Sequence, residues 1–273
     1  MLVRERSTTL GYDMTTANIP VSVREAISRM AQDYSVCLLG AQGDPDSGHF
    51  VFCGSATLAS CNGHCILITA AHVWEKVQGC TALGLTIASG SFIHPTEAFR
   101  ARSFRGAEFG PWRQDLCFVT VPPHLVSTIT ARKSLYNLEL HRTRFVAGQD
   151  VREFSHCAVV GAPGMMSALG KQQAMMTMVT FFASVVQRRT VGELDFVEVK
   201  PLESDRVALP STFGGVSGGG LWAFSLGNPP FTEQSWDGKL LLAGVAFYET
   251  PDEGQGRRIQ CQGPQTLYAA VAS

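Results

Sequence analysis

Residues 213–220 read FGGVSGGG, and the strand-like run 221–224, LWAF, follows them directly. A serine among glycines can be a flexible surface loop. The same arrangement suits a nucleophile, because glycines let the backbone approach a substrate closely and aim N–H groups at a developing oxyanion. The segment therefore marks Ser217 as a candidate nucleophile, with a plain loop as the alternative.

A histidine and an aspartate stand at the edges of two other apolar runs. Residues 66–74 read ILITAAHVW, so His72 follows a strand-like run and several small residues. Residues 114–119 read QDLCFV, so Asp115 opens another such run. Taken alone, the histidine is more often structural and the aspartate could be a turn residue at a strand end.

The three residues are chemically complementary. A serine hydroxyl must lose its proton to a base, and an imidazole base must be oriented by an acid. The chain order is His72, Asp115, Ser217. The segment around Ser217 also satisfies the G-x-S-x-G elbow of α/β-hydrolases, but that fold needs a histidine after the serine. The last histidine is His156, so the hydrolase interpretation fails.

The composition of the 273-residue chain suits a globular protein with a large core. Hydrophobic residues make up 45% and charged residues 16% of the chain, and its 27 glycines and 13 prolines indicate many turns. A net charge of -1 provides no strong field for nucleic acid or an anionic membrane, so we expect neither as a partner. Because we find no signal peptide and no bilayer-spanning apolar run, we expect a cytoplasmic protein.

Eight cysteines allow disulfides, but a chain of this size does not need them, and nothing in it indicates export. Cys53, Cys61 and Cys65, together with His64, could be interpreted as a metal cluster. Their C-x7-C-x3-C spacing matches no common zinc pattern. We therefore expect no metal and no cofactor.

From Tyr34 onwards, short apolar runs alternate with turn residues, which is typical of an all-β barrel or sandwich. Helix-length amphipathic segments between these runs are missing, which argues against a βαβ protein. Before them, residues 20–32 have helical spacing, with Val23, Ile27 and Met30 as anchors and Ser22 as a possible cap.

Three short motifs resemble the chymotrypsin/trypsin-like serine protease superfamily: TAAH at 69–72, DLCFV at 115–119 and GVSGG at 215–219. The resemblance covers about residues 35–271. It implies an all-β fold of two six-stranded antiparallel β-barrels of chymotrypsin type, with the active site between them, plus the short N-terminal helix. The expected divisions are an arm and helix (1–34), a first barrel (35–125), a connection (126–145) and a second barrel (146–273).

The resemblance also implies a role for each matched residue. Ser217 would attack the carbonyl, His72 would take its proton and return it to the leaving amine, and Asp115 would orient His72. The backbone N–H groups of Gly215 and Ser217 would form the oxyanion hole.

Two positions depart from the pattern of many secreted relatives. Val216 stands where these often have an aspartate that pairs with a newly cut N-terminus, so we expect no activation by that route. Val73 stands where they often have a cysteine. Both departures resemble bacterial or intracellular members of the superfamily.

The substrate pocket is implied by the same resemblance. Ser211 falls where trypsin-like enzymes place an acid, so strong tryptic specificity is not expected. Ala246, Phe247, Tyr248 and Glu249 resemble the strand that lines the substrate cleft. Glu249 stands where a glycine is usual in roomy pockets, so we expect it to narrow the entrance or to contact a basic residue at the rim.

The expected function is a serine endopeptidase acting on protein or peptide substrates, with an activator or sensor protein as a further candidate partner. The alternative is a catalytically idle fold of this type that serves as a binding or regulatory module. Phe247 keeps this alternative open, because relatives often have a serine there that supports the acid.

Overall fold

The structure is a computed structural model of the 273-residue chain. Residues 1–18, for which we expected an irregular arm, lie outside the part that the structure describes. The described ranges are 19–43, 49–87, 90–106, 112–146, 156–169, 174–203, 208–227, 229–251 and 256–271.

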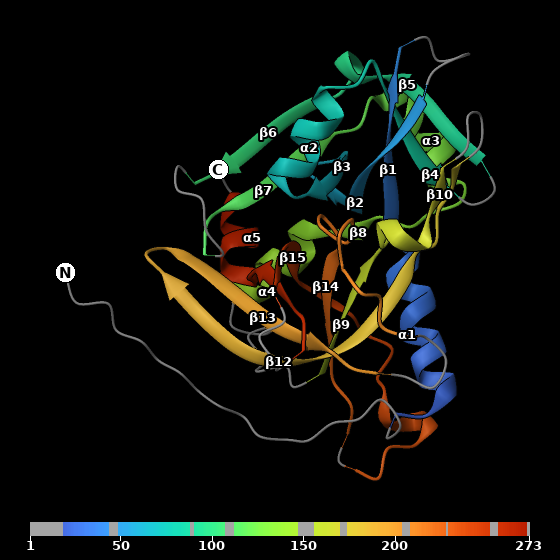
Figure 1. The fold of residues 1–273 in the computed structure, drawn as a ribbon. Coiled ribbons are helices and arrows are strands. Elements are labelled where there is room, and N and C mark those ends of the chain that lie inside the picture. The colour runs from blue at the N-terminus through green and yellow to red at the C-terminus, as the bar shows by residue number, and fades with distance from the viewer. Residues whose placement is uncertain are drawn as a thin grey trace.

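The protein is mostly β, with two large sheets and several helices. Figure 1 shows the first sheet, with α2 and α3, in the upper part of the molecule and the second sheet in the lower part, with α1 beside it. Within the described ranges, no helix is long and apolar enough to cross a membrane.

The first sheet has eight strands in the described part of the chain, in the order β5-β4-β1-β2-β3-β7-β6, with β8 paired to β2. Its strands are β1 (Ser35–Gln42), β2 (His49–Cys61), β3 (His64–Thr69), β4 (Ala82–Ile87), β5 (Gly90–Pro95), β6 (Arg100–Arg105), β7 (Asp115–Thr120) and β8 (Tyr136–Asn137).

This open half-barrel differs from the closed six-stranded barrel that we expected for residues 35–125. The sheet path ends at β5 and β6, and these two strands do not pair with each other in the described ranges. β6 has the sequence RARSFR, and five of its six residues are exposed. Charged side chains on an exposed strand protect an open edge against further pairing.

The second sheet is a closed barrel of six strands in the order β12-β13-β16-β15-β14-β9, as expected. Its strands are β9 (His156–Gly161), β12 (Val179–Val191), β13 (Leu194–Pro201), β14 (Gly220–Phe224), β15 (Leu241–Thr250) and β16 (Arg258–Gln262). A separate short hairpin joins β10 (Ala168–Leu169) and β11 (Ala174–Met175).

Alternate residues of the barrel strands fill its interior. Val159, Phe181, Val197, Leu221 and Ile259 belong to one buried cluster, each from a different strand. On β9 and β14 the intervening residues are buried as well, because other parts of the molecule cover the outside of these strands. This double burial explains their uninterrupted apolar sequence.

The predicted N-terminal helix is confirmed as α1 (Val21–Asp33), with Val23 and Ile27 fully or almost fully buried. Ser22 does not cap the helix, because the N-cap residue is Pro20, and Ser22 instead donates a hydrogen bond to Glu233 at 3.0 Å. The spacing of apolar residues reflects which face of the helix is buried and does not depend on the cap. The spacing therefore located the helix correctly, although the predicted cap was wrong.

Four further helices are short. Two of them lie in or next to the expected connection at 126–145, and the other two were not predicted. They are α2 (Ala71–Gln78), α3 (Pro123–Thr130), α4 (Leu138–Val146) and α5 (Pro264–Ala270). Single 3-10 turns occur at Thr96–Ala98, Gly164–Met166 and Glu233–Ser235.

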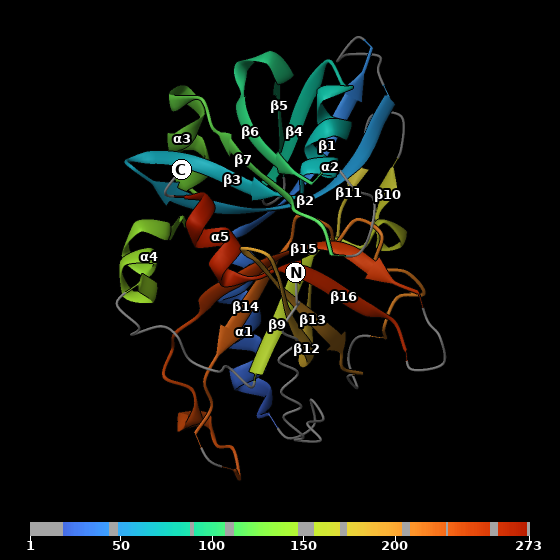
Figure 2. The same ribbon diagram turned by 90° about the vertical axis from the view of Figure 1, so that its left-hand side faces the viewer.

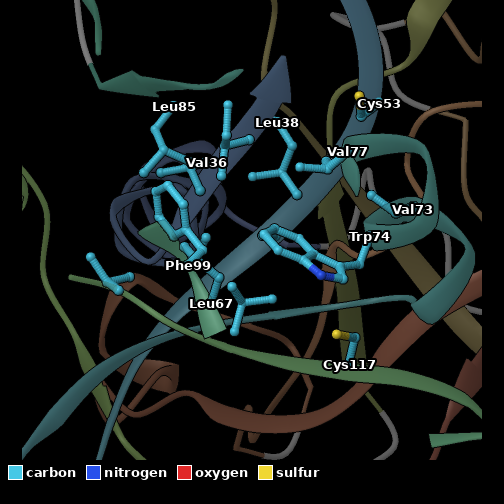
Figure 3. Packing of buried hydrophobic residues seen from close by; sticks show 14 of the residues in the cluster. Val36, Leu38, Cys53, Leu67, Val73, Trp74, Val77, Leu85, Phe99 and Cys117 are labelled. Carbon is cyan, nitrogen blue, oxygen red and sulfur yellow. The ribbon is translucent and has the colours of Figure 1, made fainter. Parts of the chain in front are cut away.

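Two buried clusters join the halves of the molecule. One lies inside the first sheet, where Trp74 of α2 packs against Phe99 with a 6.3 Å ring separation (Figure 3). Phe196 and Phe247 of the closed barrel belong to this same cluster. A second cluster combines residues of α1, β3, β14 and α5, and both ribbon views show α5 between the two halves (Figures 1 and 2).

Candidate functional site

His72 is placed by the junction between β3 and α2. Cys65 to Thr69 of β3 are buried, the backbone is extended at Ala70, and α2 begins at Ala71. Both alanines have no exposed surface, which leaves room only for small side chains there. His72 therefore lies in the first turn of a helix rather than at a strand end, and its side chain is 23% exposed.

Asp115 is the first residue of β7, and both of its carboxylate oxygens face His72. One oxygen accepts from the backbone N–H of His72 at 3.0 Å, and the other lies 2.8 Å from the ring Nδ1. The Asp115 side chain has no exposed surface. The pair therefore has the geometry in which a buried acid fixes the orientation of an imidazole.

Arg113 is a third member of this group that the sequence analysis missed. Its Nη2 lies 3.5 Å from Asp115 Oδ2, and its backbone carbonyl accepts from Gln262 Nε2 at 2.7 Å. Burial acts to raise the pKa of Asp115, but the hydrogen bonds from His72 and the charges of His72 and Arg113 outweigh it and hold the pKa below its ordinary value. An arginine two residues before the acid carried no distinctive signal in the sequence.

Ser217 lies in the loop before β14 and is packed against β2. Its carbonyl accepts from Ser55 N at 2.9 Å. Gly54 permits this approach, because a Cβ there would lie 2.8 Å from the methyl groups of Val73 and 2.9 Å from the Ser217 carbonyl oxygen. Gly54 therefore lies close both to the serine loop, which comprises residues 213–219, and to Val73, the neighbour of His72.

The structure brings the three candidate residues into one region without joining all of them. Within the described ranges, no hydrogen bond connects Ser217 to His72. The Ser217 hydroxyl instead donates to the carbonyl of Phe247 at 3.5 Å, a long hydrogen bond. His72 and Asp115 are therefore joined by hydrogen bonds, whereas the hydroxyl of the nearby Ser217 makes only one long hydrogen bond in the described part of the chain.

In the backbone of residues 214–217, all four carbonyls accept hydrogen bonds, whereas two of the four N–H groups have no acceptor in the described part of the chain. The four carbonyls accept, in chain order, from Gly164 N, Ser55 Oγ, Gly219 N and Ser55 N, at distances from 2.7 to 2.9 Å. Gly214 and Val216 donate their N–H groups within the loop. In the described part of the chain, no acceptor faces the N–H groups of Gly215 and Ser217.

In a trans peptide the N–H points away from the carbonyl of the preceding residue, so the hydrogen bonds that hold the carbonyls of Gly214 and Val216 also fix the directions of the N–H groups of Gly215 and Ser217. Gly215 has φ +97, a conformation that favours glycine, and a Cβ there would lie 2.7 Å from the Ala162 carbonyl oxygen. The predicted oxyanion-hole donors are therefore available for a ligand.

Of the predicted pocket residues, Ser211 is exposed and its hydroxyl lies 3.6 Å from the sulfur of Met165. On β15, Ala246 and Phe247 are buried, whereas Tyr248 is 38% exposed. The backbones of Ala246 and Phe247 both contact the loop of Ser217: Ala246 exchanges hydrogen bonds with Gly218 and Gly219, and the Phe247 carbonyl accepts from the Ser217 hydroxyl.

Glu249 has three hydrogen-bond partners. Its carboxylate accepts from Thr212 Oγ1 at 2.7 Å, from Phe213 N at 3.0 Å and from Arg257 Nη1 at 2.7 Å. It thus contacts a basic residue and also holds the start of the serine loop. The bracing of this loop is a role that the sequence analysis did not assign.

Metal ligands do not gather in the described part of the chain, where no group of three or more His, Cys, Asp or Glu residues could hold an ion. All eight cysteines are free thiols, and seven of them are buried. The groups that the site presents are the imidazole of His72, the carboxylate of Asp115, the hydroxyl of Ser217 and the backbone N–H groups.

No protein-family model matches the sequence, and no curated protein is significantly similar to it. One similar solved structure comes from work on aromatic interactions that drive the coupled folding and binding of the intrinsically disordered Sesbania mosaic virus VPg protein. The likeness has a TM-score of 0.43 and 14% sequence identity, and it covers 83% of this chain and 85% of that chain. A likeness of this size does not establish a family.

Proposed function

We propose that this protein is a serine endopeptidase of the chymotrypsin-like type that hydrolyses peptide bonds in protein substrates. The observation that carries the proposal is the hydrogen-bonded pair of His72 and the buried Asp115, beside a serine loop with two available N–H groups. A general base, an orienting acid and oxyanion donors are the groups that acyl transfer to a serine requires.

In this mechanism Asp115 holds the Nδ1 side of the imidazole, so Nε2 is left to accept the Ser217 proton. The Ser217 oxygen then bonds to the substrate carbonyl carbon, and the resulting oxyanion accepts from the N–H groups of Gly215 and Ser217. His72 returns the proton to the leaving amine as the peptide bond breaks. Water hydrolyses the acyl-enzyme by the same steps, with His72 as the base.

The contacts around the pocket indicate that the enzyme has no strong preference for Lys or Arg at the P1 position of its substrates. Ser211 provides no negative charge, and Glu249 is already paired with Arg257 and with the loop of Thr212 and Phe213. A carboxylate with three protein partners is less available to a substrate lysine or arginine. Peptide-library profiling should therefore show no dominant preference for Lys or Arg at P1, and such a preference would contradict this part of the proposal.

The proposed location is the cytoplasm. The eight free thiols are compatible with a reducing compartment, where disulfides rarely persist. Cell fractionation with an antibody to the protein tests this, and recovery only from an oxidising compartment would contradict it.

The proposed activity is tested with a fluorophosphonate probe, which bonds covalently to an activated serine. We expect labelling of the wild type and no labelling of Ser217→Ala at equal concentration and equal melting temperature. Labelling that persists in Ser217→Ala would place the reactive serine elsewhere. Proteomic cleavage profiling of the wild type against the same variant then identifies substrates.

A second candidate function is a catalytically idle module that binds or regulates a partner. It is favoured by the absence of a Ser217–His72 hydrogen bond in the described ranges and by the buried phenylalanine at position 247. The module predicts a folded wild type that is never labelled. Because an inhibited enzyme would give the same result, labelling should also be tested after removal of residues 1–18, which leaves the packed helix α1 intact.

A further inference from the structure

Ser55 is a fully buried serine on β2 that contacts three other segments of the molecule. Its backbone N–H donates to the Ser217 carbonyl at 2.9 Å, and its hydroxyl donates to the Gly215 carbonyl at 2.9 Å. The same hydroxyl accepts from Ala162 N at 2.9 Å. Its carbonyl accepts from Thr69 Oγ1 at 2.7 Å.

These contacts link the two halves of the candidate site. Thr69 is the last residue of β3, three positions before His72, whereas Gly215 and Ser217 belong to the loop of the closed barrel. Ser55 supplies two of the four hydrogen bonds that hold the carbonyls of residues 214–217. Both of these come from the first sheet, so Ser55 ties the serine loop to the segment that carries His72.

We propose that Ser55 is a positioning residue that keeps the serine loop in the conformation needed for the oxyanion hole; this inference rests on the proposed function. Its hydroxyl donates a hydrogen bond to the Gly215 carbonyl and accepts one from the backbone N–H of Ala162, and an alanine can do neither. Without it, the buried Gly215 carbonyl loses its partner, and the loop can rotate this peptide to find another. That peptide carries the N–H of Val216, and its rotation changes the backbone torsions at Gly215 and Val216. Because these torsions set the directions of the neighbouring peptides, the N–H groups of Gly215 and Ser217 would shift away from the oxyanion.

The chain offers a matched control on the same strand. Thr57 is also fully buried on β2, and its hydroxyl has no hydrogen-bond partner in the described part of the chain. Thr57→Val removes a buried hydroxyl of similar position while keeping the shape of the side chain. Any general effect of altering the interior of β2 should therefore appear in this variant too.

The experiment measures the second-order rate of fluorophosphonate labelling and the melting temperature for wild type, Ser55→Ala, Ser55→Cys and Thr57→Val. Removing one oxyanion donor lowers rates by about 100- to 1,000-fold, so we expect Ser55→Ala to label at least about 10-fold more slowly. Thr57→Val should label within about twofold of the wild type, by the same scale. Ser55→Cys, with its weaker hydrogen bonds, should lie between wild type and Ser55→Ala.

The outcomes separate this inference from the proposed function. A wild type that is not labelled, or labelling that survives Ser217→Ala, overturns the proposed function and this inference with it. If labelling depends on Ser217 but Ser55→Ala reacts at the wild-type rate, or Thr57→Val slows equally, the inference about Ser55 alone is wrong. If Ser55→Ala does not fold, Ser55→Cys decides, and a wild-type rate in a folded Ser55→Cys overturns the inference.

Discussion

Both carboxylate oxygens of Asp115 are engaged by His72, and Arg113 lies 3.5 Å from one of them. This leaves the acid fully buried yet charged, since its partners compensate for the lost water. Phe247 is buried, and its side chain carries no polar group. Arg113 adds a polar contact to those that His72 makes with Asp115.

The lowered pKa of Asp115 has a consequence for stability at low pH. A carboxyl whose folded pKa lies below its ordinary value of 3.8 stabilises the fold above that value, and this contribution is lost as the pH falls through the folded pKa. We therefore expect the difference in unfolding free energy between wild type and Asp115→Asn to shrink between pH 5 and more acidic conditions. Urea unfolding at a series of pH values measures it, and a difference that is independent of pH would contradict the prediction.

The buried thiols should be unreactive in the folded protein. Burial raises the pKa of the Cys53 thiol to about 12 and those of Cys65 and Cys117 to about 11. Because the thiolate is the reactive form, alkylation at pH 8 should be slow at these positions and fastest at the partly exposed Cys61. Mass spectrometry after iodoacetamide treatment checks this, with the urea-unfolded protein as the control in which all eight cysteines react.

At the scale of single elements, α1 is part of the folded core rather than an appended arm. Val23, Ile27 and Ala31 are buried in the cluster that also contains Trp222 of β14 and Leu267 of α5. The helix therefore covers the outer face of the barrel, and its removal would expose that face.

This packing predicts a large effect of one α1 substitution. Ile27 has no exposed surface, so Ile27→Ala should lower the free energy of unfolding by about 2 to 5 kcal/mol. Arg29, on the exposed side of the same helix, provides the control, and Arg29→Ala should change it by less than about 0.5 kcal/mol. Equal effects in urea titrations would mean that α1 does not contribute to the core in solution.

At the scale of the whole molecule, the half-barrel and the closed barrel share a buried cluster. Phe196 of β13 and Phe247 of β15 are buried in the cluster of the first sheet, and the ring of Phe196 also meets Trp112 at 5.7 Å. Trp112 precedes the Arg113–Asp115 segment directly. The hairpin of β12 and β13 thus supports the acid of the candidate site from the opposite half of the molecule.

Shared clusters predict that both halves unfold together. Phe196→Ala should destabilise the molecule by about 3 to 5 kcal/mol, although the residue belongs to the barrel. Hydrogen-exchange mass spectrometry in increasing urea can follow first-sheet and barrel peptides separately, and we expect one common midpoint in wild type and variant. Two separate midpoints would show that the halves are independent units.

The sequence by itself determined the elements whose signal is local. Short apolar runs between turn residues indicated an all-β chain, helical spacing located α1, and short motifs marked His72, Asp115 and Ser217 as candidates. These signals depend on backbone preferences and on which face of one element is buried, both of which can be read from neighbouring residues. The open edge of the first sheet was not predicted, because closure depends on whether distant strands meet.

Only the tertiary structure decided how the candidate residues are supported. Ser55 and Gly215 are 160 residues apart, Arg113 and Gln262 are 149 apart, and neither pair has a sequence pattern that links its members. Hydrogen bonds of this kind arise because folding excludes water from buried polar groups, which must then find partners among whatever segments the packing brings near. The candidate residues could therefore be named from residue types, whereas their geometry depended on the packing of the two halves.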